Sequence, residues 1–261
     1  MIAATLTVPV LAPVELILAE MRQRRGEDAT RGLVPGLILP DRAAGWTPAS
    51  ALISGERLGA VLAAAERRWG GSPHAGAALA WKCYTYWLAL PAVLGWAAAR
   101  RVPLLDPDDV LVRVSSRQPF LTVGLRRARV AVLPSDPLAA TGGDVTVASS
   151  EAELLAVFRD TLRDRHLDPL LAQIRSWVRL GERTLLGSLA SGVAHGVLRG
   201  VRGDADDLRR TADTLLSALG VADLVNLEPT PDGYAVHRRT CCLAFTLPTP
   251  KVCSGCCIRS A

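Results

Sequence analysis

The most apolar part of this chain, residues 77 to 99, constrains the fold because it has to be buried wherever it lies. Its length is close to the ~20 residues that a helix needs to cross a bilayer. Polar side chains and a helix breaker interrupt it: Lys82, Tyr84, Tyr86 and Pro91. The stretch therefore predicts a buried core helix, with a membrane-associated element as the alternative.

Aromatic side chains lie at helical spacing within this stretch. Trp81, Tyr84 and Trp87 follow one another at three-residue steps, so they share a helix face. Packing in a core is the expected role of that face. The alternative is the wall of a ligand site, because clefts that bind organic molecules are lined mainly by apolar and aromatic groups.

The composition describes a chain that can fold around a substantial core. It has 261 residues, of which 49% are hydrophobic, enough for one large domain or two small ones. The net charge is +5, and Lys82 and Lys251 are the only lysines. Arginines are scattered among acids, as in Arg159-Asp160, instead of forming a basic stripe with interleaved aromatics. We therefore expect no nucleic-acid partner.

Hydrophobic periods predict an α+β fold that is predominantly helical. In the first half we expect a loop over residues 32 to 54 and helices at residues 13 to 24, 56 to 69 and 77 to 100. Alternating valines from residue 110 begin a predicted small antiparallel β meander of three strands, at residues 110 to 115, 120 to 125 and 129 to 133.

The second half carries stronger helix signals. Ser150 and Glu153 form a capping-box pattern that begins a helix. Apolar periods predict three more helices, around residues 167 to 178, 185 to 197 and 208 to 219. The middle one carries glycines that each cost about 1 kcal/mol relative to alanine, which indicates close packing or a kinked cleft wall: Gly187, Gly192 and Gly196. An extended piece near residues 234 to 237 follows.

Five of the six cysteines come after residue 240: Cys241, Cys242, Cys253, Cys256 and Cys257. The first four have the spacing Cys-Cys-x10-Cys-x2-Cys, and sulfur-only sites select iron–sulfur clusters or zinc over harder metals. A structural zinc site usually has two Cys-x2-Cys pairs, and only residues 253 to 256 have that form. The adjacent Cys241 and Cys242 point to opposite faces of an extended segment, which suits the wider ligand spread of two irons.

The array therefore favours a [2Fe-2S] cluster held by Cys241, Cys242, Cys253 and Cys256, with zinc and disulfides as alternatives. Against disulfides, the first twenty residues contain no Lys or Arg to form the basic region of an export signal. We expect a cytoplasmic chain, in which thiols stay reduced. The role of Cys257 stays open, as a spare thiol, an alternative ligand or an oxidation site. The distant Cys83 is expected to be a small buried hydrophobe.

Several residues around the array can assist a cluster. Arg238 and Arg239 can offset the negative charge of four thiolates and raise the reduction potential, the alternative being a solvated pair. Gly255 allows the backbone of the Cys-x2-Cys loop to approach a sulfur closely. His237 is expected at the surface, with ligand and hydrogen-bonding roles as alternatives, and His166 is expected to be structural or cleft-lining. The other histidines, His74 and His195, give no functional signal.

The segments Arg238-Arg239-Thr240-Cys241-Cys242-Leu243, Leu247-Pro248 and Cys253-Ser-Gly-Cys256 together resemble the C-terminal signature of the FhuF-type siderophore ferric reductases. A softer resemblance covers residues 166 to 170 and Leu186-Gly187-Ser188, where that family commonly has Trp-Gly-Asn. Cys257 departs from the family pattern, and Phe245 stands where that family has a tyrosine. The resemblance covers about residues 150 to 261, and it is most specific in the four cysteines.

The resemblance implies an oxidoreductase of iron uptake, a cytoplasmic ferric-siderophore reductase in which a [2Fe-2S] cluster passes one electron to the ferric siderophore and so releases ferrous iron. It also implies an electron donor such as a ferredoxin or its reductase, and a mildly basic surface suits such a donor or an anionic ferric chelate. Transient contact with the inner membrane face stays open.

The alternative functions are a non-catalytic iron–sulfur or zinc-binding protein with a structural metal site, and a siderophore-synthetase-like enzyme. The sequence has no glycine-rich nucleotide loop for the latter. We expect three segments: N-terminal helices plus β meander at residues 1 to 145, a helical substrate-binding region at 146 to 230, and a [2Fe-2S]-binding segment at 231 to 261. Together they predict a helical bundle with a small meander and a C-terminal iron–sulfur-binding tail.

Overall fold

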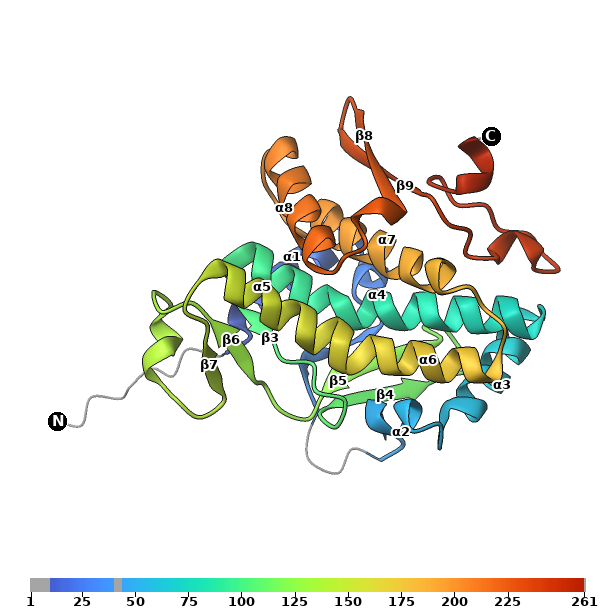
Figure 1. The fold of residues 1–261 in the computed structure, drawn as a ribbon, viewed down its shortest axis with the longest axis horizontal. Helices are drawn as coiled ribbons and strands as arrows, with labels where there is room; N and C mark the ends of the chain where they lie inside the picture. The colour runs from blue at the N-terminus through green and yellow to red at the C-terminus, as the bar shows by residue number, and fades with distance from the viewer. Residues whose placement is uncertain (1–9, 40–43, 261) are drawn as a thin grey trace.

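A computed structural model describes residues 10 to 39 and 44 to 260, and it has an α+β fold in which helices predominate (Figure 1). This confirms the predicted fold class at the level of its secondary structure. A long central helix, α4 (Pro73–Ala99), lies among the other helices. The sheets of the first half of the chain lie on one side of it, and the last, two-stranded sheet lies on the opposite side. The segment after the last strand, red in Figure 1, lies far from β6 and β7.

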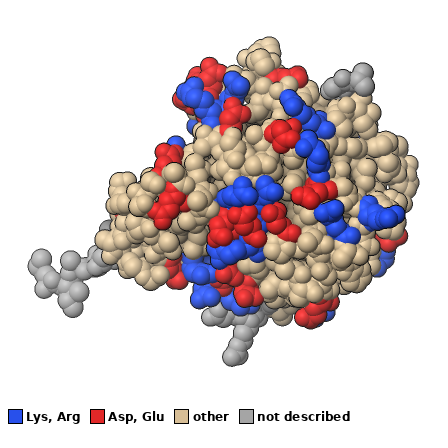
Figure 2. All heavy atoms as spheres, viewed as in Figure 1, with Lys and Arg blue, Asp and Glu red and all other residues tan. Residues whose placement is uncertain are grey.

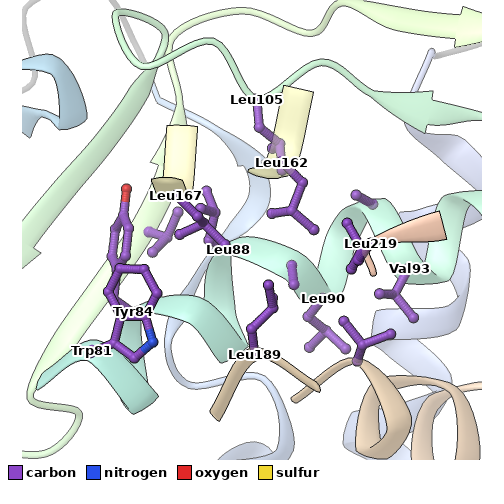
Figure 3. Packing of buried hydrophobic residues seen from close by; sticks show 14 of the residues in the cluster. Trp81, Tyr84, Leu88, Leu90, Val93, Leu105, Leu162, Leu167, Leu189 and Leu219 are labelled. Carbon is purple, nitrogen blue, oxygen red and sulfur yellow. The ribbon is translucent and has the colours of Figure 1, made fainter. Parts of the chain in front are cut away.

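Helix α4, Pro73–Ala99, is the predicted core helix, and its burial is confirmed. Ser72 caps it by accepting a hydrogen bond from the Ala75 N–H, and Pro91 is accommodated inside it. Three helices pack against it: α1 (Ala12–Arg25), α3 (Leu58–Trp69) and α7 (Glu182–Gly200). Figure 3 shows its Trp81, Tyr84 and Leu88 among leucines of the second half of the chain. In the described part of the chain, no helix is long and apolar enough to cross a membrane.

Two of the three glycines singled out in α7, Gly187 and Gly196, have the close-packing role that their positions predict. A Cβ at Gly196 would lie 3.2 Å from Cγ1 of Val93 on α4, whereas one at Gly192 would meet Cα of Tyr86 at an ordinary 3.5 Å. A side chain at Gly200 would overlap Leu94 of the same helix. Because α4 and α7 come from the first and second predicted segments, one continuous core joins those two segments.

The β structure differs from the predicted three-strand meander. Strands β4 (Val110–Val114) and β5 (Leu121–Leu125) form the expected antiparallel hairpin. The third strand, β6 (Val130–Val132), leaves it and joins a separate sheet. There it lies between β3 (Val102–Pro103, antiparallel) and β7 (Val145–Val147, parallel). The turn before β6 is held by the buried carboxylate of Asp109, which accepts hydrogen bonds from Arg127 and Arg129 at 2.9 and 2.6 Å.

Residues 32 to 54 are not the predicted loop. They contain β1 (Leu33–Ile38), β2 (Thr47–Pro48) and the short helix α2 (Ala49–Ile53), apart from the residues that are not described. Strand β1 pairs in parallel with β5, and β2 pairs antiparallel with β4. Pro35 and Gly36 are unfavourable in strands, so the sequence does not indicate β1. Its partner strand is also distant in the chain. The strand is also irregular, since Gly36 and Leu37 have positive φ angles.

The second half forms the predicted helices. Helix α5 (Glu151–Arg159) continues through a π-helical segment, η3 (Asp160–Leu167), into α6 (Asp168–Trp177). Ser150 caps α5 through the Glu153 N–H, as the capping box predicts, but the Glu153 carboxylate bonds to Ser149 instead of the Ser150 backbone. On the face in Figure 2, basic and acidic side chains are intermingled. Arg165 and Asp160 of η3 form an ion pair at 2.7 Å.

The chain ends with α8 (Ala205–Ala218) and a hairpin of β8 (Val225–Thr230) and β9 (Gly233–Arg238), of which only β9 was predicted. Short 3-10 turns complete the described elements: η1 (Glu27–Ala29), η2 (Pro137–Ala140), η4 (Ala222–Leu224), η5 (Ala244–Thr246) and η6 (Cys257–Ser260).

Candidate metal centre and adjoining cavity

The C-terminal tail folds back on strand β9. The Arg238 N–H donates to the Gly255 carbonyl at 2.9 Å, and within the tail the Lys251 N–H donates to the Ala244 carbonyl at 3.0 Å. A Cβ at Gly255 would overlap the carbonyl oxygen of Val236. Gly255 therefore lets the Cys-x2-Cys loop approach the strand, in addition to the approach to sulfur that the sequence predicts. This return brings the end of the tail beside its beginning.

The two adjacent cysteines lie in different surroundings. Cys242 is buried in a small apolar cluster with Leu79 of α4 and Leu247 of the tail. Cys241 is half-buried, and its sulfur accepts a hydrogen bond from the Leu243 N–H at 3.2 Å. Leu243 has a left-handed backbone (φ 61°), which turns the chain after the pair.

The structure brings Cys241 and Cys256 near Cys257. Burial raises the pKa of the Cys257 thiol, the negative charges of Cys241 and Cys256 raise it further, and Arg238 opposes them. Cys253, by contrast, is exposed. All cysteines are free thiols, and residues 10 to 39 and 44 to 260 hold no group of three or more His, Cys, Asp or Glu side chains arranged to bind a metal ion.

Arg238 is the most unusual charged group near the tail. It is only 5% exposed, and its Nη2 donates to the Ser188 hydroxyl at 2.9 Å and the Thr240 hydroxyl at 3.5 Å. Its Nε and Nη1 are buried without a hydrogen-bond partner, and no carboxylate of the described residues lies within salt-bridge distance. A buried cation of this kind is costly unless an anion compensates it. Arg239 is exposed, so the predicted pair is split by strand alternation.

The segment Leu186-Gly187-Ser188 of α7 holds the entry to the tail. Ser188 accepts the hydrogen bond from Arg238, and a side chain at Gly187 would overlap the Thr240 hydroxyl. Because Thr240 directly precedes the first cysteine pair, these contacts fix where the array begins. They give a physical reason for a small residue at position 187 and a polar one at 188.

The histidines singled out by the sequence have partners other than the cysteines. His237 Nε2 lies 3.3 Å from the Glu228 carboxylate across the β8–β9 hairpin. His166 is fully buried: its Nδ1 donates to the Leu105 carbonyl at 2.7 Å, and the Tyr84 hydroxyl donates to its Nε2 at 2.5 Å. Burial lowers the pKa of His166 to about 4, so the ring is neutral at pH 7. Its role is structural.

A cavity of about 340 Å³ lies between α4 and α7, beside the tail. Four aromatic side chains line it, from α3, α4 and the segment before β5: Trp69, Tyr86, Trp87 and Phe120. Trp81 and Tyr84 belong instead to the core, so the predicted aromatic face is divided between the two roles. Cys83 is half-buried and lines the cavity, rather than being a fully buried hydrophobe, and burial raises the pKa of its thiol.

The cavity also has residues that sequence reasoning missed. Arg68 and Phe120 come from segments far from α7 in the chain, and only the tertiary fold brings them to His195 and Ser188. The spacing of α7 residues 188, 191, 192 and 195 on one helix face was the available signal, because all four line the cavity. Ser188 belongs both to this lining and to the contact with Arg238.

The chain matches no family model and no curated protein sequence. The likeness to siderophore ferric reductases therefore depends on the cysteine array and its flanks. The donor set and the uncompensated Arg238 fit an anionic group of four thiolates around two irons, whose net charge is negative. The four sulfurs do not converge in this structure, since Cys242 packs on α4 and Cys253 faces solvent.

Proposed function

We propose that this protein is a cytoplasmic ferric-siderophore reductase that holds a [2Fe-2S] cluster on Cys241, Cys242, Cys253 and Cys256. The observation that carries the proposal is the Cys-Cys-x10-Cys-x2-Cys array beside a buried guanidinium, that of Arg238, which lacks a carboxylate partner in the described chain. An anion at this place would remove the electrostatic cost of burying that charge.

The bound group supplies one-electron transfer at a potential that four thiolates keep low. Ser188 and Thr240 hold the Arg238 guanidinium in place. With a cluster bound, this cation would stabilise the extra negative charge of the reduced state and so raise the potential. The Leu243 N–H donates to the Cys241 sulfur and has the same effect on a smaller scale. Cys241, Cys242, Cys253 and Cys256 would hold the cluster.

The reaction is a single electron transfer. The ferric ion of the siderophore accepts one electron and becomes ferrous, which binds hard oxygen ligands more weakly and is released. An external one-electron donor, such as a ferredoxin or its reductase, restores the reduced protein. No acid or base is needed, which agrees with the structural role of His166 and the pairing of the half-buried His237 with Glu228.

The test is stoichiometric reduction of a ferric siderophore by chemically reduced protein, with ferrous iron detected by a colour-forming chelator. We expect about one Fe(II) per cluster from the unsubstituted protein and none from Cys241→Ser or Cys256→Ser. Ser176→Ala is the control, because Ser176 is exposed on α6, outside both the array and the lining of the cavity, and it should retain the reaction. Full reduction by the two tail variants would contradict the proposal and leave a structural metal site as the alternative.

A further inference from the structure

We propose that the cavity between α4 and α7 binds an anionic ferric chelate with aromatic oxygen donors, such as catecholate rings, in preference to a neutral hydroxamate chelate. This inference rests on the proposed reductase function for the ferric ion, but it concerns the binding site itself. Four observations carry it: the charge of the lining, the neutral state of its histidine, the aromatic walls, and the contact with the cysteine tail.

The charged side chains of the lining are all basic: Arg31, Arg68 and Lys82. Arg31 is partly neutralised, because its Nη1 lies 3.1 Å from the Asp28 carboxylate and 2.9 Å from the Gln118 amide oxygen. For Arg68 and Lys82, the described residues provide no carboxylate within salt-bridge distance. Both cations are half-buried, so they are less screened by water than surface charges. An anion is the complementary ligand.

The surroundings of His195 are also positively charged. Burial lowers its pKa to about 4, and the cations Arg199, Lys82 and Arg238 contribute to the shift. The ring is therefore neutral at pH 7 and can donate one hydrogen bond to a chelate oxygen from the α7 side of the cavity. With Ser188 and Ser191 it adds neutral polar groups to a wall whose only charges are positive.

The aromatic walls suit flat rings. Trp69 and Phe120 lie with their ring centroids 4.7 Å apart, and Tyr86 and Trp87 form a T-shaped pair at the same separation. A Cβ at Gly32 would overlap the Trp87 indole, so the absence of a side chain at position 32 leaves room for the ring. Rings prefer offset or edge contacts with other rings, and these two pairs provide both faces and edges to a catecholate arm. The volume of about 340 Å³ accommodates such an arm, not an entire large chelate.

The cavity contacts the tail at two points. Ser188 lines it and accepts the hydrogen bond from Arg238. Leu79 lines it and packs against the buried Cys242. A chelate arm in the cavity would thus lie beside both the cation and one thiol of the array.

Redox-inert Ga(III) chelates test binding without any electron transfer. We would titrate the anaerobically purified protein by calorimetry with three probes: a trianionic Ga(III) tris-catecholate, an anionic Ga(III) citrate complex without aromatic rings, and a neutral Ga(III) trihydroxamate. The tris-catecholate should bind at least about tenfold more tightly than the trihydroxamate, a difference that shrinks as salt increases. The citrate complex should fall between them, because it has the charge without the rings.

Substitutions place the binding in the cavity. Lys82→Gln and Arg68→Gln should each weaken tris-catecholate binding by about five- to tenfold and leave trihydroxamate binding unchanged. Arg165→Gln is the matched control, since Arg165 is exposed on η3 and outside the cavity lining, and it should bind like the unsubstituted protein. Thermal unfolding of each variant checks that the fold is retained.

The outcomes separate this inference from the reductase proposal. Equal or tighter binding of the trihydroxamate, or tris-catecholate binding that Lys82→Gln and Arg68→Gln leave unchanged, would overturn the inference even if ferric chelates are reduced. Cavity-dependent tris-catecholate binding without reduction of the ferric complex would sustain the binding site and contradict the reductase function.

Discussion

Two arginines, Arg101 and Arg238, are almost fully buried. The two regions that hold them differ in whether a carboxylate lies beside the buried charge. Arg101, 7% exposed, follows α4, and its Nε and Nη2 donate to both carboxylate oxygens of Asp136 at 2.6 and 3.0 Å. Arg238 has two hydroxyl partners and, within the described chain, no carboxylate. The N-terminal region therefore balances its buried cation with its own residues. The C-terminal region leaves its buried cation without a carboxylate partner among the described residues.

Removal of the carboxylate in the balanced region should have the largest effect. Asp136→Asn keeps a side chain that can cap η2 but leaves Arg101 without a counter-charge. We expect the free energy of unfolding, measured with urea, to fall by about 3–5 kcal/mol. Asp223→Asn, which removes the partner of the exposed Arg183, should change it little. A loss as small for Asp136→Asn would mean that Arg101 does not need its partner.

A third buried group, His166, is neutral at pH 7, and the pH dependence of the unfolding free energy tests this assignment. Its pKa is about 4 in the folded protein, against about 6.5 when unfolded. The unfolded chain binds the proton more tightly, so stability is full above pH ~6.5 and falls as the pH decreases toward 4. The expected loss from this group is about 3 kcal/mol. His166→Asn should make this part of the stability profile less steep, with the remaining slope due in part to His195, whose pKa is also lowered to about 4. An unchanged profile would contradict the neutral assignment of His166.

Gly187 sharpens the comparison at the contact between α7 and the tail. Gly187→Ala should destabilise the protein by about 1–3 kcal/mol, because the new methyl group overlaps Thr240 and displaces the start of the cysteine array. Gly203→Ala, whose methyl group would meet Leu208 at an ordinary 3.5 Å, is the control. If the two variants unfold at the same urea concentration, the tail does not depend on this close contact. Thr240→Gly should relieve the Gly187→Ala defect.

The smallest expected effect comes from Arg238 itself in protein without metal. Arg238→Met removes a buried cation that has no carboxylate partner in the described chain, so it should change the unfolding free energy by less than about 1 kcal/mol or increase it. In protein loaded with the cluster, the same substitution should make the reduction potential more negative. A loss of several kcal/mol without metal would show that the hydroxyl groups of Ser188 and Thr240 suffice as partners.

Local sequence signals predicted local structure well. The apolar stretch gave α4, the glycines of α7 predicted its close packing, and the valine alternation predicted the β4–β5 hairpin. Strand β1 was missed because its partner β5 is distant, and β6 was misplaced because the Asp109 contacts turn the chain into another sheet. No pattern in one sequence specifies such pairings.

The candidate site shows the same limit. The sequence identified the cysteine array and both flanking arginines, but not which arginine would be buried, because that depends on how β9 packs against α7. It also could not divide the aromatic residues of α4, since Trp81 faces the core and Trp87 faces a cavity completed by Phe120 and Arg68. These roles depend on contacts between distant segments.

The most direct test of the central claim is the metal content and spectroscopy of anaerobically purified protein. Iron, sulfide and zinc would be counted on one sample, with visible and EPR spectra before and after dithionite. We predict about two irons and two sulfides per chain, and a visible absorption that bleaches as a paramagnetic reduced state forms. A colourless protein with one zinc per chain would contradict the account and leave the tail as a structural metal site.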